Sequence, residues 1–437
     1  MVFLFAGCSR STAVEDVTPD SAEQHQPGKE DIAAQIASLL NQPIELSIYE
    51  SSSGYTQEMF MELYGNALVR KYPNMTYKLY SPHQDNGGLG LPELIAQGVK
   101  LDLIKASGAS FYTLLVDNGL EDDISDLIEK YHYDLDQFHP AVLQQMRMYG
   151  SGKEIYGIPN AVAATALFYN QDIFNKFAVP YPKDRMTWDD IYELARRLSV
   201  QEAGVSYLGF QENISFLTIT NQLSESFLDP KTNRITIHTD KWRKFILNFA
   251  RFHEIEGNAM LASYNNAMWK EGRVAMAVGS SGGSWNFTFE APFNWDLVEL
   301  PVFKDLPTSG SGQQVPFHAI SKTSQHRDQA FLIAAHIASE EFQREFAKLG
   351  YVPPIKIEGL QELLGASVPQ LQGKNIKAAV PLEIAAPPFP TNGYQSVIAG
   401  YVNNAYRAVA RGEKDVNTAL REAQELAEKK LQEVLSN

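Results

Sequence analysis

The sequence is short of cysteine, of basic residues relative to acidic ones, and of long apolar runs. A single cysteine in 437 residues, Cys8, excludes a disulfide framework within the chain and a cysteine-based metal site. The sequence has 37 Lys and Arg residues and 52 Asp and Glu residues, which gives a net charge of −15. Such a surface repels nucleic-acid phosphates and anionic lipid. We therefore expect no nucleic-acid partner, and nothing in the sequence predicts a metal or a cofactor.

The bulk composition is that of a large globular protein. Hydrophobic residues make up 44% of the chain and charged residues 20%. A chain of this length and composition can bury a sizeable core, and two or more domains are favoured over one. No internal apolar run approaches the ~20 residues that a membrane-spanning helix needs.

The opening stretch, MVFLFAGCSR, places small residues directly before Cys8. FAGC resembles the bacterial lipobox, in which the cysteine becomes the N-terminus and carries a lipid. We expect residues 1–8 to be the truncated end of a lipoprotein signal peptide, with Cys8 as the lipidation site at the outer face of the cell membrane. An ordinary cysteine is the alternative, because no Lys or Arg precedes the apolar stretch. Residues 9–43 are predicted to be a flexible, acidic tether followed by a short helix.

Beyond the tether, strand and helix patterns alternate. Residues 44–50 and 75–81 alternate apolar and polar side chains as strands do, and an amphipathic helix pattern lies between them. A helical stretch over 91–100 precedes a strand over 101–107. This order predicts an α/β layered domain with a largely parallel sheet. Farther on, Thr187 is predicted to cap a helix over 187–200, and Gly350 to end a long helical region.

Several segments together resemble the family 1 extracellular solute-binding proteins, the sugar-type receptors of ABC importers. The resemblance runs from about residue 44 to the end, and its strength lies in the order of the segments. These segments are GVKLDLIKASG, GKEIYGIPNAVAATALFYNQDIF, MTWDDIYELARRL, MWKEGRVAMAVGSSGGSW, AISKTSQHRDQAFLIAAHIASEEFQREFAKLGYVPP and GEKDVNTALREAQELA.

The resemblance implies an α/β, two-lobe periplasmic-binding-protein-like fold with a ligand cleft between discontinuous lobes. The N-terminal lobe is expected over 44–162 plus 300–338, and the C-terminal lobe over 163–299 plus 339–437. The expected crossings lie near 161–166, 297–303 and 337–341. The resemblance also implies a monomeric receptor, not an enzyme. This receptor closes on a carbohydrate and delivers it to ABC transporter permease subunits.

A sugar cleft needs aromatic platforms beside short polar and carboxylate side chains, placed on loops at the ends of strands. Solvated or Gly-rich turns are the alternative for the polar positions, a hinge cap for Asn160, and the protein core for Trp285. Trp269, on a helical stretch, is expected in the core. Asn160 and the last three candidates follow from the family resemblance. The candidate ligand-binding residues are Glu50, Ser51, Ser53, Asp85, Ser107, Ser110, Asn160, Trp285, Phe389, Asn392 and Tyr394.

Two other functions are alternatives to the carbohydrate receptor. Residues 279–283 match G-x-S-x-G, which would make Ser281 the nucleophile of a lipid-anchored hydrolase. That motif must lead directly into a helix, whereas here it leads into an aromatic, Pro-containing stretch. The same fold could instead bind a polyamine, a metal chelate or a phosphorylated compound. Such ligands need several unpaired acids, or Arg and helix N-termini, and the aromatic and Ser/Asn loops favour a neutral carbohydrate.

Overall fold

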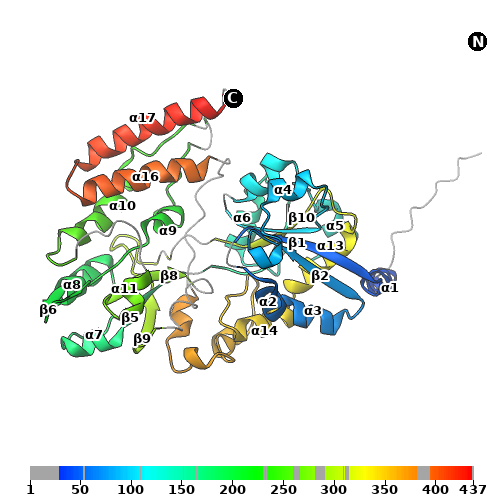
Figure 1. The fold of residues 1–437 in the computed structure, drawn as a ribbon, viewed down its shortest axis with the longest axis horizontal. Coiled ribbons are helices and arrows are strands. Elements are labelled where there is room, and N and C mark those ends of the chain that lie inside the picture. The colour runs from blue at the N-terminus through cyan, green and yellow to red at the C-terminus, as the bar shows by residue number, and fades with distance from the viewer. Residues whose placement is uncertain are drawn as a thin grey trace, which may run out of the picture.

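The computed structural model describes residues 29–435, except 53–54, 109, 151, 164, 230–231, 233, 259–265, 281–290, 309, 311–313 and 381–393. Figure 1 shows two lobes side by side, each with its own sheet. The elements before the first crossing are α1 (Lys29–Leu40), β1 (Ile44–Glu50), α2 (Gln57–Phe60), α3 (Asn66–Lys71), β2 (Met75–Tyr80), α4 (Leu91–Ala96), β3 (Leu103–Ala106), α5 (Ser125–Lys130), α6 (Pro140–Arg147) and β4 (Ile158–Pro159).

The chain then builds the second lobe and returns. The second lobe contains β5 (Thr165–Asn170), α7 (Gln171–Lys176), α8 (Trp188–Leu198), β6 (Val200–Glu202), β7 (Val205–Tyr207), α9 (Ile214–Ile219), α10 (Asp240–Ala250), α11 (Asn266–Lys270), β8 (Met276–Ser280) and β9 (Trp295–Glu299). The remaining elements are β10 (Phe317–Ile320), α13 (Arg327–Ile337), α14 (Glu340–Lys348), α15 (Leu360–Leu363), α16 (Gln395–Ala410) and α17 (Val416–Leu435).

The sheet of the first lobe has the strand order β2-β1-β3-β10-β4 among the described residues. The first three strands are parallel, as the alternating strand and helix patterns predict, and β10 runs antiparallel to both its neighbours. β2 alternates buried and exposed residues, which is the pattern of a strand with one face on the core. α13 packs against β10 and β4, and α1 packs against α13. The returning β10 therefore joins the two halves of the first lobe.

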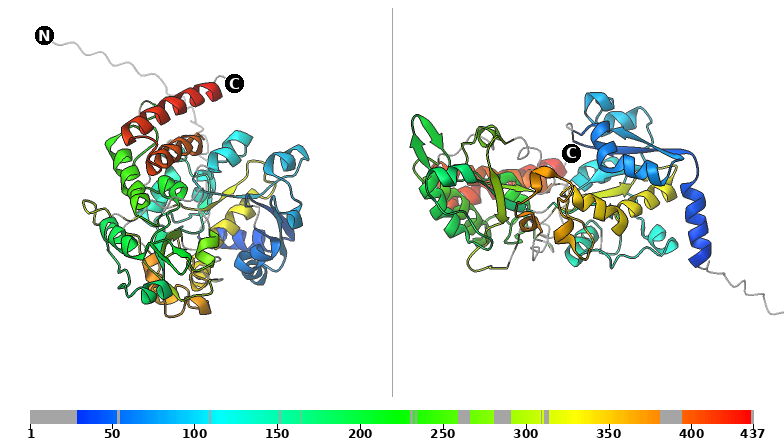
Figure 2. Two further views of the ribbon diagram at one scale, coloured as in Figure 1. Left: turned by 60° about the vertical axis from the view of Figure 1, so that its left-hand side comes forward. Right: turned by 90° about the horizontal axis from the view of Figure 1, so that it is seen from below.

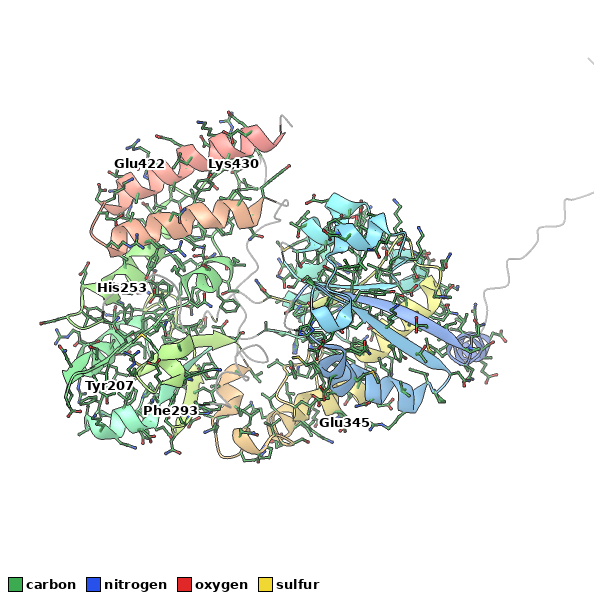
Figure 3. All side chains as sticks on the ribbon, viewed as in Figure 1. Tyr207, His253, Phe293, Glu345, Glu422 and Lys430 are labelled. Atoms are coloured by element: carbon green, nitrogen blue, oxygen red, sulfur yellow. The ribbon has the colours of Figure 1, made fainter. Side chains whose placement is uncertain are left out.

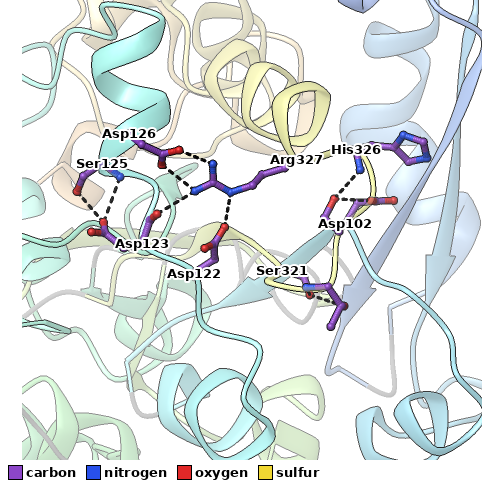
Figure 4. Close-up of polar contacts among 10 residues, drawn as sticks. Asp102, Asp122, Asp123, Ser125, Asp126, Ser321, His326 and Arg327 are labelled. Atoms are coloured by element: carbon purple, nitrogen blue, oxygen red, sulfur yellow. Dashed lines mark hydrogen bonds and ion pairs between the residues drawn. The ribbon is translucent and has the colours of Figure 1, made fainter.

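A buried carboxylate fixes β3 to the segment between β10 and α13 (Figure 4). Asp102 is 3% exposed, and its carboxylate accepts hydrogen bonds from the Ser47 N–H at 2.9 Å and the Ser324 hydroxyl at 2.6 Å. At the start of α13, Arg327 donates to the carboxylates of Asp122 and Asp126 at 2.5 to 2.7 Å. A guanidinium held by two carboxylates is a directional anchor, so the returning chain is tied to the loop before α5.

The second lobe is built on the antiparallel sheet β8-β5-β9. On its far side α10, α16 and α17 pack together, and Figure 1 shows α16 and α17 as a helical pair at the C-terminal end. β5 is buried along its whole length, and alternate residues serve two cores. Leu167 and Tyr169 face the core of the second lobe, whereas Ala166 and Phe168 belong to a cluster continuous with that of the first lobe.

The capping predictions are confirmed. Thr187 accepts a hydrogen bond from the Asp190 N–H, and the Asp190 carboxylate accepts one from the Thr187 N–H at 2.8 Å, so α8 begins with a capping box. Gly350 follows α14 with a φ of +90°, a conformation that favours glycine. The helical region before Gly350 is divided into α13 and α14 at Ser339. The Ser339 hydroxyl accepts a hydrogen bond from the Phe342 N–H and so caps the start of α14.

Backbone hydrogen bonds connect the segments that pass between the lobes. The Val162 N–H donates to the carbonyl of Val352, and the Ala163 N–H donates to that of Gln314, both at 2.9 Å. These contacts place three passages of the chain side by side between the two sheets. Among the described residues, no helix is both long and apolar enough to cross a membrane.

The third passage lies farther along the chain than the sequence predicted. The sequence predicted a crossing at 337–341 and a second-lobe segment from 339 onward, whereas α14 still belongs to the first lobe. α14 packs into the first-lobe core, because the Phe342 ring stacks on Tyr64 and the Phe346 ring lies 5.3 Å from the same tyrosine ring. Farther along, the short helix η7 (Ile376–Ala379) packs against β9 of the second lobe. Residues 340–379 thus form a bridge, which Figure 2 shows in orange between the lobes.

Candidate functional site

The carboxyl ends of the parallel strands bring the predicted polar residues to one edge of the first sheet. β1 and β3 are parallel, and β4 runs in the same direction because both β3 and β4 are antiparallel to β10. The loops that begin at Ser51, Ser107 and Asn160 therefore all leave this edge. In open α/β sheets this is where ligands bind.

Glu50, the last residue of β1, forms an ion pair with its cross-strand neighbour Lys105. The Glu50 Oε2 to Lys105 Nζ distance is 2.6 Å, and the two side chains are 10% and 25% exposed. The ammonium also lies 4.8 Å from the ring centroid of Tyr55. A carboxylate this buried needs a partner, since its desolvation is costly. The pair therefore leaves a charge-balanced patch beside an aromatic ring.

The Tyr55 hydroxyl is a buried donor at the same edge. It has no hydrogen-bond partner among the described residues. Burial, and next the neighbouring Tyr64 and Glu50, raise the pKa of Tyr55 well above its ordinary value, so the hydroxyl keeps its proton. Its backbone is held in place, because the Asn86 amide donates to the Tyr55 carbonyl at 2.8 Å and the Ser81 hydroxyl does so at 3.1 Å.

Asn160 sits in a buried polar cluster where β4 meets the passage between the lobes. It is 1% exposed, its amide nitrogen lies 3.4 Å from His318 Nδ1, and its carbonyl accepts a hydrogen bond from Gln343 Nε2 at 2.9 Å. Burial, with a smaller effect of Lys105, lowers the pKa of His318 to about 3, so the ring is neutral at pH 7. The Asn160 Oδ1 atom has no partner among the described residues.

The turn after β3 is closed by its own serines. The Ser107 N–H donates to Ser110 Oγ, and that hydroxyl donates to the Ser107 carbonyl, both at 2.8 Å. The Gly108 N–H donates to the Tyr149 hydroxyl at 2.9 Å. These hydrogen bonds close the turn on itself. They are those expected if Ser107 and Ser110 only build a Gly-rich turn, which is the alternative to ligand binding for these two residues.

At the second sheet, β5 begins and β8 ends at one edge. Thr165 is paired with Ser280, and the segment 281–290 follows directly. Near that sheet, Trp269 is completely buried and packs edge-on against Phe293, with ring centroids 5.2 Å apart. The prediction that Trp269 belongs to the core is confirmed.

Comparison with known proteins decides the family. Residues 67–344 match the family model described as bacterial extracellular solute-binding protein. The chain belongs to this family. Among curated proteins, this solute-binding protein is 23% identical over 300 residues to the arabinooligosaccharide-binding protein of Bacillus subtilis. That alignment covers 65% of this chain and 67% of the relative.

Solved structures show the same fold. An ABC substrate-binding protein from Listeria monocytogenes, in complex with cycloalternan, superposes with a TM-score of 0.70 at 17% identity. The match covers 90% of this chain and all of that one. UgpB from Mycobacterium tuberculosis, in complex with glycerophosphocholine, gives 0.69 at 16% identity and covers 90% and 99%. The predicted α/β two-lobe fold of a solute-binding protein is confirmed.

The predicted ligand-binding residues fall into three groups. Glu50 and Asn160 are buried at the edge of the first sheet, and Ser51, Ser107 and Ser110 lie on the loops that leave it. Asp85 is exposed in the short helix η2 (Gln84–Asn86), and the half-buried Tyr394 precedes α16 and packs on the second-lobe core. Ser53, Trp285, Phe389, Asn392, Ser281 and Cys8 lie outside the described residues.

Sequence reasoning missed Tyr55, Lys105 and His318. Lys105 interrupts the otherwise apolar end of β3, and a lysine one residue before a strand end is a signal that could have been used. His318 gave no such signal, because its position beside Asn160 depends on the return of β10 into the first sheet.

Proposed function

We propose that this solute-binding protein is an extracellular carbohydrate receptor. It captures a neutral sugar or oligosaccharide between its lobes by closing on it, and it delivers the sugar to the permease subunits of an ABC importer. It acts as a monomer, without catalysis and without a cofactor. The names of the arabinooligosaccharide-binding relative and the cycloalternan complex support a carbohydrate ligand.

The charge-balanced pair of Glu50 and Lys105 beside Tyr55 carries this proposal. At a sheet edge this buried, a cation receptor would present unpaired acids, and an anion receptor would present an unpaired Arg or Lys. Here the carboxylate and the ammonium neutralise each other, and an aromatic ring and a hydroxyl without a partner lie beside them. Sugar hydroxyls can donate to the carboxylate, and sugar C–H faces can pack on rings.

A phosphorylated solute is the second candidate, because UgpB was solved with glycerophosphocholine. The edge of the first sheet argues against it, since the cation described there, Lys105, is already paired with a buried carboxylate. The hydrolase alternative rests on Ser281 alone. If the chain were a hydrolase, incubation with its best ligand would return products that Ser281→Ala abolishes, whereas a receptor returns the ligand intact.

Calorimetric titration against a defined panel tests the proposal. The panel contains arabinotriose, mannobiose, a maltooligosaccharide, glycerophosphocholine and spermidine. We expect a neutral sugar to bind, and Glu50→Gln to weaken that binding about tenfold through loss of a charge-assisted hydrogen bond. Glu45→Gln, at the exposed start of the same strand, is the matched control and should bind normally. Binding of only the charged compounds would overturn the carbohydrate assignment.

The location proposed is extracytoplasmic, with the chain anchored to the outer face of the cell membrane by a lipid on Cys8. Mass spectrometry of the membrane fraction, from a host that supplies a complete signal peptide, should find a diacylglyceryl group on Cys8. An unmodified Cys8 in a secreted chain would refute the anchor and leave the ligand assignment intact.

A further inference from the structure

The outer face of α10 forms one wall of a hollow of about 500 Å³ in the second lobe. Its inner face carries buried Trp242, Phe245 and Phe249, so the residues between them point outward. The opposite wall is the segment 303–305 after β9, together with the start of α8. Figure 1 shows α8 and α10 on the side of the second lobe that lies away from the first. The hollow is therefore separate from the sheet edge described above.

The cations of this hollow lie deeper than their acidic partners. Lys244 pairs with Asp305 at 2.5 Å, and their side chains are 36% and 70% exposed. Arg251 pairs with Asp189 at 2.6 Å, with 28% and 62% exposed. The acids thus sit at the rim, in water, where ion pairs contribute little. An anion that enters the hollow can replace them at small cost.

Two hydrogen-bond donors on the same wall are unused. Arg243 Nε and Asn248 Nδ2 are both buried and have no hydrogen-bond partner among the described residues. Burying a donor without an acceptor is unfavourable, so a side-chain shift that gives either atom an acceptor would stabilise the protein. Carboxylate and phosphate oxygens are the acceptors that also suit the neighbouring cations.

Apolar groups complete the lining. Leu247 is 46% exposed on the wall between the cations, and Phe303 and Trp188 are buried beneath. The ammonium of Lys244 lies 4.7 Å from the ring centroid of Phe303. A hydrated inorganic ion would leave this apolar surface uncovered, whereas an organic body would bury it.

We propose that this hollow is a second binding site, which takes a small organic anion: a phosphate or carboxylate group on an apolar body. The oxyanion binds Lys244, the side chains of Arg243 and Asn248 turn their buried donors toward it, and the apolar body packs on Leu247. The site does not depend on the carbohydrate assignment, because it shares no described residue with the edge at Glu50 and Lys105.

Calorimetry on the full chain at low ionic strength tests this site with phenyl phosphate, benzoate, inorganic phosphate and phenol as probes. We expect at least one of the two organic anions to bind more tightly than inorganic phosphate and phenol. The comparison of phenyl phosphate with benzoate identifies the preferred oxyanion. Binding of neither, or binding of phenol as tight as that of the anions, would overturn the proposal.

Charge variants locate the site. Lys244→Gln should weaken the organic anion about tenfold, and Asp305→Asn should strengthen it, because it removes the competing rim carboxylate. Lys348→Gln is the matched control, since Lys348 is 33% exposed and pairs with Glu345 at 2.7 Å on α14. Unchanged affinity in both Lys244→Gln and Asp305→Asn would overturn the assignment, and melting curves show that each variant is folded.

Discussion

At the scale of single residues, the proposal of a neutral ligand depends most on the ion pair of Glu50 and Lys105. The carboxylate is nearly buried, and the ammonium lies 2.6 Å from it. Removing one partner of such a pair leaves an uncompensated buried charge, which costs more than the pair contributes to stability.

Lys105→Met should therefore lower the free energy of unfolding by about 2 kcal/mol at pH 7. The double variant Glu50→Gln, Lys105→Met should recover part of that loss, because no charge is then left unpaired. Urea unfolding measures both. Lys71→Met, in the more exposed pair with Glu341, is the control and should cost at most about 1 kcal/mol. Additive effects in the double variant would show that the two groups do not interact.

Trp285 presents a second prediction at this scale, made from the Gly/Ser loop that precedes it in the sequence. If the ring stacks on a sugar, Trp285→Ala lowers affinity at least about tenfold and changes stability little. If the ring belongs to the core, the same change costs about 3–5 kcal/mol of stability. One calorimetric titration and one melting curve separate the two, and a large loss of stability with unchanged affinity would remove Trp285 from the site.

At the scale of elements, the contact between α8 and the bend that follows β7 depends on the absence of a side chain at Gly209. A Cβ there would lie 2.1 Å from the carbonyl oxygen of Ala195, a backbone atom that cannot move alone. We expect Gly209→Ala to destabilise the protein by at least about 1–3 kcal/mol. Gly400→Ala, inside α16 with no atom within 4 Å of the new Cβ, should instead stabilise it by up to about 1 kcal/mol. Equal effects on the melting temperature would contradict this packing.

A buried triad ties α16 to the body of the second lobe and predicts a pH dependence. His253, shown in Figure 3, lies 2.7 Å from the Tyr406 hydroxyl and 3.1 Å from Glu212 Oε1, and its other ring nitrogen faces the Asn258 carbonyl. Burial alone would lower the pKa of His253, but the hydrogen bond and charge of Glu212 outweigh it, so the pKa is raised. The folded state therefore holds this proton more tightly than the unfolded state.

The stabilisation from His253 should be complete below the unfolded pKa of about 6.5, and it should be lost as pH rises through the raised folded pKa. The stability difference between the wild type and His253→Gln should accordingly shrink from pH 6 to pH 9. His318 acts in the opposite sense: its lowered pKa, about 3, removes stability as pH falls below about 6.5. Unfolding curves from pH 6 to pH 9, for the wild type and His253→Gln, measure the contribution of His253. A difference that grows with pH would contradict the charged state of His253.

Local patterns predicted most elements but not the contacts between distant ones. The alternation in β2 and the Thr187 cap of α8 are written in neighbouring residues, so sequence reading found them. The insertion of β10 between β3 and β4 pairs Phe317 with Ala106 across more than 200 residues, and no local pattern specifies it. The same holds for α14. Phe342 and Phe346 form an ordinary amphipathic face, and nothing in the local sequence specifies that both pack on Tyr64.

For the candidate site, sequence reading identified the loops better than the partners. Glu50 was predicted from its place at the end of a strand and Asn160 from the family resemblance, and both lie at one sheet edge. That Glu50 is neutralised by Lys105 depends on the register between β1 and β3, and the neutral ring of His318 depends on burial by several elements. Both properties depend on the assembled lobe. For this reason, only the structure allows the charge balance of the site to be used as an argument for a neutral ligand.

At the scale of the whole molecule, we propose that two lobes connected by three passages of the chain hold a neutral carbohydrate between them. The hydrogen bonds of Val162 and Ala163 link those passages, and the bridge over 340–379 contacts both lobes. Because a ligand shifts a conformational equilibrium only by binding one state more tightly, a sugar held by both lobes must favour the closed form.

Small-angle X-ray scattering of the full chain, with and without saturating arabinotriose or whichever neutral sugar of the panel binds, tests this most directly. We expect a smaller radius of gyration with the sugar, and no such change with Glu50→Gln at a sugar concentration that saturates only the wild type. A radius of gyration that stays the same when calorimetry shows the site to be full would contradict a ligand held between the lobes.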